Sequence, residues 1–101
     1  TTVETWTRFR EGLNPALIAV KRGLTESTIY EHLATVIDHG LLPVSEVVSP
    51  DRQAQILAAW HAEGCGDRLK PIKERLPEEI SYGEIRCVLV AQQTALRREH
   101  S

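Results

Sequence analysis

The stretch from Asn14 to Gly40, which reads NPALIAVKRGLTESTIYEHLATVIDHG, has the pattern of two helices joined by a tight turn. Asn14 followed by Pro15 is typical of a helix start, because an Asn side chain caps free backbone N–H groups and Pro has no N–H to leave unpaired. Gly23 suits the left-handed conformation that ends many helices. Thr25 is a suitable cap for a second helix, which Gly40 would close. The sequence therefore predicts a helix-turn-helix.

The second predicted helix, residues 26–39, separates apolar from polar side chains. Its large apolar residues recur at helical spacing, so we expect them to face the core; they are Ile29, Leu33, Val36 and Ile37. The side chains expected to point outward are Glu26, Ser27, Thr28, Tyr30, Glu31 and Thr35. In a helix-turn-helix, the second helix is the one that enters the major groove of DNA.

Cap and glycine signals predict further helices before and after this unit. We expect them near residues 2–11, 50–63, 69–76 and 82–96, the last one opened by a capping box of Ser81 and Glu84. No segment shows a two-residue turn between alternating strands. The predicted fold is all-α or nearly so, a multi-helix bundle that contains the helix-turn-helix. A small two-stranded wing after Gly40 is the alternative to a helical turn there.

The size and charge of the chain limit what this unit can do. A chain of 101 residues forms a single domain, and its net charge is −2. No Lys or Arg occurs between Leu24 and Gly40, so the common contact of a guanidinium with guanine is missing from the second helix. Contact with phosphates, rather than reading of bases, is therefore the predicted mode of nucleic-acid binding. An ordinary solvated surface is the alternative.

The candidate contacts in the helix-turn-helix follow from the chemistry of the outward side chains. Ser27 and Thr28 stand beside free N–H groups at a helix start, where phosphate oxygens bind. Tyr30 suits a sugar or a thymine methyl group, and Glu31 suits the amino group of cytosine. Two cations at the end of the first helix can neutralise phosphates. These candidates are Lys21, Arg22, Ser27, Thr28, Tyr30 and Glu31.

A second basic group lies near the end of the chain. Lys70, Lys73 and Arg75 alternate with Leu69 and Ile72, which are expected to be buried, so the cations should form an exposed ridge. Lys70 and Lys73 are therefore further candidates for phosphate contact. The alternative is a solvated helix face with no ligand.

Signatures of catalysis and of metal binding do not occur. His61 and Cys65 have the spacing of a metal-ligand pair, but no second pair accompanies them, so we expect no metal site. The sequence has neither a nucleophile elbow nor a phosphate-binding loop. We therefore expect a chain that is not an enzyme in itself and needs no cofactor.

The sequence also suggests a cellular setting. Two cysteines are too few for a disulfide scaffold, which favours a cytoplasmic protein. No apolar run approaches the roughly 20 residues that cross a bilayer, so no membrane partner is expected. The sequence has no methionine, even at position 1. We interpret the chain, residues 1–101, as one domain excised from a longer protein.

The runs at residues 18–33 and 69–91 resemble a domain at the C-terminal end of bacterial RecQ-type and related DNA helicases. Residues 18–33 are similar to that family's run IA-x-x-R-G-L-(S/T)-x-S-T-I-x-x-H-L. Residues 69–91, LKPIKERLPEEISYGEIRCVLVA, are similar to its closing motif. The resemblance implies a non-catalytic accessory domain of an ATP-dependent DNA helicase. Its implied partners are DNA, the helicase core of the parent chain or a partner protein.

Two other functions remain open. The helix-turn-helix surface could be a protein-interaction module that docks a partner or the helicase motor. The first half alone also resembles the DNA-binding domain of LuxR-type transcription regulators, whose recognition helix contains S/T-x-x-T-(V/I)-x-x-H-L. Those domains are shorter and do not explain residues 67–101.

Overall fold

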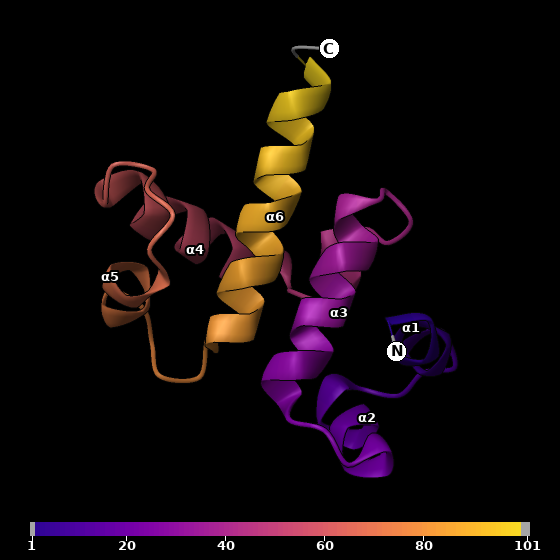
Figure 1. The fold of residues 1–101 in the computed structure, drawn as a ribbon. Coiled ribbons are helices and arrows are strands. Elements are labelled where there is room, and N and C mark those ends of the chain that lie inside the picture. Colours follow the sequence, from indigo (N-terminus) through magenta and orange to yellow (C-terminus); the bar gives the residue numbers. More distant parts are fainter. Residues whose placement is uncertain (1, 100–101) are drawn as a thin grey trace.

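The structure is a computed structural model that describes residues 2–99 of the chain. Figure 1 shows an arrangement built from helices, and none of the described residues forms a strand. The α-helices are α1 (Thr2–Arg10), α2 (Pro15–Arg22), α3 (Glu26–Asp38), α4 (Pro50–Ala62), α5 (Leu69–Glu74) and α6 (Tyr82–Glu99), and a 3-10 turn, η1, spans Val44–Glu46. The predicted all-α fold is confirmed. The segment after Gly40 forms η1 in place of a wing.

The helix α6 runs through the middle of the molecule and separates two groups of helices (Figure 1). On one side, α3 packs along α6, and α1 and α2 pack on α3. On the other side, α4 and α5 pack on α6 and on each other. The helices α3 and α6 run in the same direction, because Cys87 meets Tyr30 near their beginnings and Thr94 meets Asp38 near their ends. The result is a flattened molecule of 37 × 35 × 21 Å.

The helix-turn-helix forms with the predicted end signals. The side-chain oxygen of Asn14 accepts a hydrogen bond of 2.9 Å from the N–H of Leu17 at the start of α2. Gly23 ends α2 with a φ of +65°, and the N–H of Leu24 then donates to the carbonyl of Ala19. Thr25 caps α3 by accepting from the N–H of Thr28 at 3.2 Å. These local bonds satisfy some of the backbone groups that a helix end leaves open.

The second half of the chain uses the same kind of signals. Ser49 caps α4 by accepting from the N–H of Arg52. Ser81 and Glu84 form the predicted capping box of α6: the Ser81 hydroxyl accepts from the N–H of Glu84 at 3.2 Å, and the Glu84 carboxylate accepts from the N–H of Ser81 at 3.3 Å. The start of α6 is therefore fixed by its own sequence.

The core lies mainly between α3 and α6. The four apolar residues that the sequence assigns to the inner face of α3 are all buried, as predicted. Ile85, Val88 and Leu89 of α6 meet them, and Trp60 of α4 is buried on the opposite side of α6. Among the described residues, no helix combines the length and apolar content needed to cross a bilayer.

Candidate nucleic-acid interface

The turn between α2 and α3 presents some of the predicted contacts to solvent. Lys21 and Ser27 are exposed, on either side of the turn. Thr28 is half-buried, and its hydroxyl lies 3.0 Å from the hydroxyl of Thr25, the residue that caps α3. The turn therefore places an ammonium and the open first turn of a 13-residue helix at one edge of the molecule. A helix start of this kind attracts anions through its free N–H groups.

The structure places Arg22 away from this edge. Only 11% of its side chain is exposed, and its Nε lies 3.3 Å from the carboxylate of Glu4 in α1. Its Nη1 donates a hydrogen bond to the hydroxyl of Thr5, which is fully buried. Contact with a phosphate would require these bonds to break. Arg22 therefore holds α1 and α2 together, and the interface proposed below does not include it.

The same hydroxyl connects this network to α3. The Thr5 Oγ1 lies 2.7 Å from Nδ1 of His32. Oγ1 accepts from Arg22 and can donate its own proton to Nδ1, an arrangement in which the imidazole proton is on Nε2. Burial lowers the pKa of His32, and the positive charge of Arg22 lowers it further, whereas Glu31 acts in the opposite sense. The fold therefore favours the neutral form of His32.

This network predicts a pH dependence of stability. Because the pKa of His32 is lower in the folded chain than in the unfolded one, the unfolded chain binds the proton more readily. The stabilising contribution is complete above the unfolded pKa, and it is lost as the pH falls through the folded pKa. We expect the urea midpoint to fall more in the natural chain than in His32→Gln between about pH 7.5 and pH 5.5, a window around the ordinary histidine pKa. Equal falls in both proteins would contradict the assignment.

Tyr30 corrects an expectation from the sequence. It was expected to point outward, but it is half-buried, and its ring lies against Gly83 at the start of α6. Burial, and next the negative charge of Glu84, raises the pKa of Tyr30 to about 12. The physical reason is that Gly83 has no side chain, so α6 approaches α3 closely enough to cover the ring. Tyr30 is therefore a packing residue of the α3–α6 contact.

Glu31 is exposed, but it does not stand on a free helix face. It lines an open groove of about 740 Å³ between α3 and α6. The α3 side of the groove carries Glu31 and Asp38, whereas the α6 side carries Arg86 and Arg97, and Arg97 pairs with Asp38. The outer stripe of α3 thus has α6 beside it and is acidic. Both features oppose insertion of α3 into the major groove of DNA, because the walls of the DNA groove carry phosphates.

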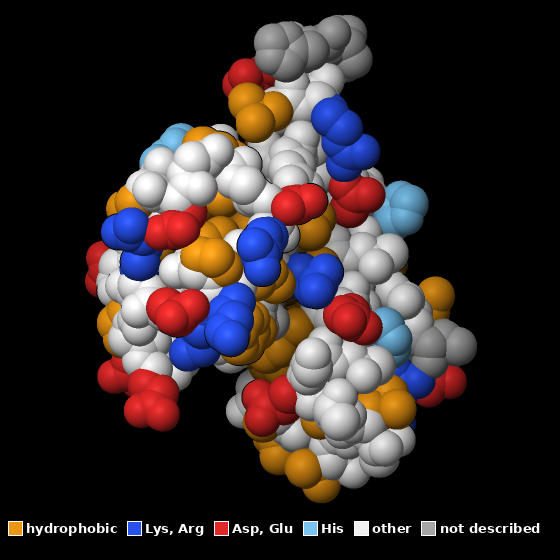
Figure 2. Space-filling model, turned by 60° about the vertical axis from the view of Figure 1, so that its left-hand side comes forward, with side chains coloured by type: hydrophobic (Ala, Val, Ile, Leu, Met, Phe, Trp, Pro, Cys, Tyr) orange, Lys and Arg blue, Asp and Glu red, His pale blue; other side chains and the backbone are white. Residues whose placement is uncertain are grey.

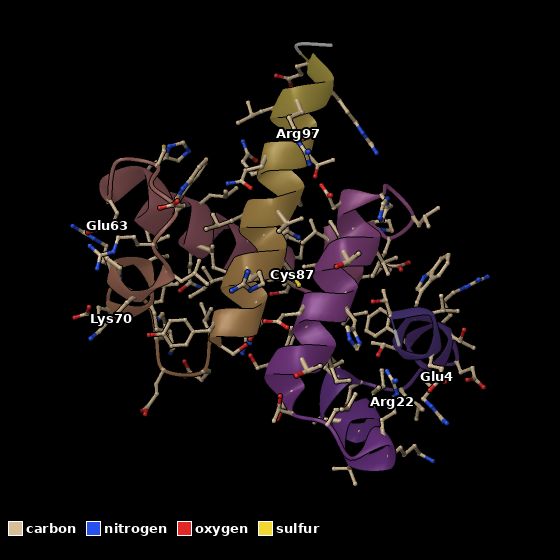
Figure 3. The ribbon with its side chains drawn as sticks, viewed as in Figure 1. Glu4, Arg22, Glu63, Lys70, Cys87 and Arg97 are labelled. Atoms are coloured by element: carbon tan, nitrogen blue, oxygen red, sulfur yellow. The ribbon has the colours of Figure 1, made fainter. Side chains whose placement is uncertain are left out.

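Lys70 and Lys73 lie far from the turn between α2 and α3. They belong to α5, on the opposite side of α6, and Figure 3 shows Lys70 and Arg22 at opposite sides of the molecule. Lys70 is exposed, whereas Lys73 is half-buried and its Nζ donates to the carbonyl of Glu78 at 3.2 Å. Arg75, on the same predicted ridge, pairs with Glu63. The structure therefore divides the candidate cations between two separate faces.

Sequence reasoning missed one candidate, Arg86. This exposed arginine of α6 lines the α3–α6 groove and makes no ion pair with another described residue. The motif around it was interpreted only as a helix start followed by an apolar face. The available signal was its position four residues after Tyr82, which places both side chains on one side of a helix.

His61 and Cys65, the two residues with metal-ligand spacing, lie close together. The Sγ of Cys65 lies 3.3 Å from Nδ1 of His61 at the exposed end of α4. Within residues 2–99, no group of three or more potential metal ligands forms around them or elsewhere. Cys87 is buried, and burial raises the pKa of its thiol to about 12.

The two capped helices and their short glycine turn define this chain as a helix-turn-helix protein. A comparison with protein families agrees: a family described as a helix-turn-helix domain matches residues 1–89. The chain therefore belongs to this family of helix-turn-helix domains. Neither the curated proteins nor the solved structures gave a match. Helix-turn-helix domains of this class commonly bind nucleic acids.

Proposed function

We propose that this chain is a non-catalytic, nucleic-acid-binding accessory domain of a cytoplasmic bacterial ATP-dependent DNA helicase. The observation that carries the proposal is the helix-turn-helix itself, with Lys21 and Ser27 exposed on either side of its turn. The similarity of residues 18–33 and 69–91 to the helicase-associated domain supports the context. The family match runs beyond the helix-turn-helix through α4 and α5, which favours this context over a LuxR-type regulator.

The proposed contact is with phosphates of duplex DNA. Lys21 offers a mobile ammonium, and the exposed hydroxyl of Ser27 stands at the first turn of α3. The acidic outer stripe of α3 supports a contact confined to the edge of the helix, away from the bases. A site with so few cations should bind weakly, should show little preference for sequence, and should depend strongly on salt.

Binding to a fluorescently labelled forked duplex tests this function. We expect Lys21→Gln to weaken binding about equally for all sequences, and to reduce the slope of log affinity against log salt by about 0.9. The matched control is Arg97→Gln, which removes the same charge at the far end of α6 (Figure 3). If both variants lose affinity equally, only general charge is involved. If the natural chain does not bind at low salt, the proposed function is wrong.

The helicase context has its own test. The gene that encodes this chain is expected to encode helicase motor motifs, including a phosphate-binding loop, ahead of position 1. A ligand-sensing or receiver domain there would instead support the regulator.

A second function is favoured by a specific surface. Leu17, Val20 and Leu24 share one side of α2 and its end, and they are 48%, 79% and 36% exposed. Figure 2 shows hydrophobic side chains at the lower edge of the molecule, where Figure 1 places α2. An apolar stripe on a helix is suited to protein contact. Docking on the helicase motor through α2 is therefore the alternative role of the same unit.

A further inference from the structure

The start of α6 exposes an aromatic side chain. Tyr82 is 46% exposed, whereas Trp60 is buried and Trp6, Phe9 and Tyr30 are packed against the core. Tyr82 is not needed to open α6, since the Ser81–Glu84 capping box does so. Fold stability therefore does not account for an aromatic ring at this position.

Cations lie on α6 itself and on α5, which packs on α6. Arg86 is one helical turn after Tyr82, on the same side of α6, and it is exposed. On α5, the Nζ of Lys73 donates to the carbonyl of Glu78, in the loop that leads from α5 into Tyr82. Lys70 precedes Lys73 by three residues and is exposed at the outer end of α5. Figure 2 shows a face of the molecule on which Lys and Arg side chains lie among Asp and Glu side chains and hydrophobic surface.

These observations combine an exposed aromatic ring with positive charges on α5 and α6. We infer that single-stranded nucleic acid binds across α5 and the start of α6, with one base stacked on Tyr82 and the adjacent phosphates on Arg86, Lys73 and Lys70. The inference rests on the proposed function, because it names a further nucleic acid that the domain takes and a second site for it. A single strand is required because a duplex keeps the faces of its bases stacked on one another, whereas an unpaired base offers its face to an aromatic ring.

The surrounding charges set the strength of this site. Glu78 and Glu79 lie on the loop between α5 and α6, and Glu31 lies across the groove from Arg86. These carboxylates repel phosphates, so the site accommodates a short length of strand and depends strongly on salt. A helicase exposes such strands as it separates a duplex. The two faces of the domain would then contact the duplex and the separated strand at one fork.

The experiment measures the binding of the chain to a fluorescein-labelled oligothymidylate of roughly 12 nucleotides, within the range that one small module covers. We expect Tyr82→Ala to weaken binding about tenfold, because stacking of one base on an aromatic ring has this effect. Tyr82→Phe keeps the ring and should bind like the natural chain. Leu96→Ala is the matched control, since it removes a comparably exposed apolar side chain of α6.

The cations give a separate readout. Arg86→Gln and Lys70→Gln should each reduce the slope of log affinity against log salt by about 0.7, the value for one phosphate of a single strand. The inference is overturned if Tyr82→Ala binds like the natural chain, or if Tyr82→Phe loses as much affinity as Tyr82→Ala. If duplex binding through Lys21 persists in that case, the proposed function stands without the second site. If neither nucleic acid binds, both are wrong.

Discussion

Replacing Gly83 with alanine is expected to lower the free energy of unfolding by about 2 kcal/mol, a typical cost of overpacking a close contact. A Cβ atom at this position would lie 2.3 Å from Cγ and Cδ2 of Tyr30 and 2.6 Å from its Cβ. These atoms lie close to the backbone of α3, so a rotation of the side chain cannot move them all away. The two helices must separate, although alanine is a better helix former than glycine by about 1 kcal/mol. Urea unfolding followed by circular dichroism measures the loss.

A second glycine provides the control for this prediction. Gly66 has no atom within 4 Å of an added Cβ and lies outside the left-handed region, so Gly66→Ala should change stability by less than about 0.5 kcal/mol. In a chain that already carries Tyr30→Gly, the further change Gly83→Ala should cost little, because the obstructing ring and its Cβ atom are both gone. Equal losses from Gly83→Ala with and without the ring would mean that another contact is responsible.

Gly83 also shows where prediction from the sequence stops. Local signals predicted the helices of the structure, because caps, prolines and left-handed glycines act within a few residues along the chain. The motif around Gly83 was interpreted in this local way, as a helix start. The reason for a glycine there lies 53 positions earlier in the chain, at Tyr30, and nothing in the local pattern points to it. The outward expectation for Tyr30 was wrong for the same reason.

The candidate site shows the same difference between what local signals predict and what packing decides. Exposure of Lys21 and Ser27 follows from their places on capped helices, and the sequence predicted it. Arg22 differs because its orientation depends on Glu4 and Thr5 of another helix. Lys21 and Arg22 are adjacent and belong to the same local pattern, yet their surroundings in the structure differ. The choice of partner across helices is a property of packing, and a single sequence does not reveal it.

The ion pair between Arg52 and Glu84 also depends on packing between helices. Its loss should be the most damaging change to a charged residue. The carboxylate of Glu84 is nearly buried, and it accepts hydrogen bonds of 2.9 and 2.8 Å from Nη1 of Arg52 in α4. The Arg52→Ala variant leaves this carboxylate buried without its cation. We expect a clear loss in the free energy of unfolding, moderated by the 39% exposure of the Arg52 side chain, because removing the cation uncovers the desolvation cost of the nearly buried carboxylate.

A second substitution distinguishes this explanation from a simple loss of contact by the direction in which it changes the free energy of unfolding. Adding Glu84→Gln to Arg52→Ala should recover part of the stability, because an amide fills the same place at the start of α6 without a charge. Arg75→Ala provides the comparison, since its partner Glu63 and Arg75 itself are more exposed, and it should cost about 1 kcal/mol or less. A double variant less stable than Arg52→Ala would show that Glu84 stabilises α6 through its capping bond to Ser81 more than its buried charge destabilises it.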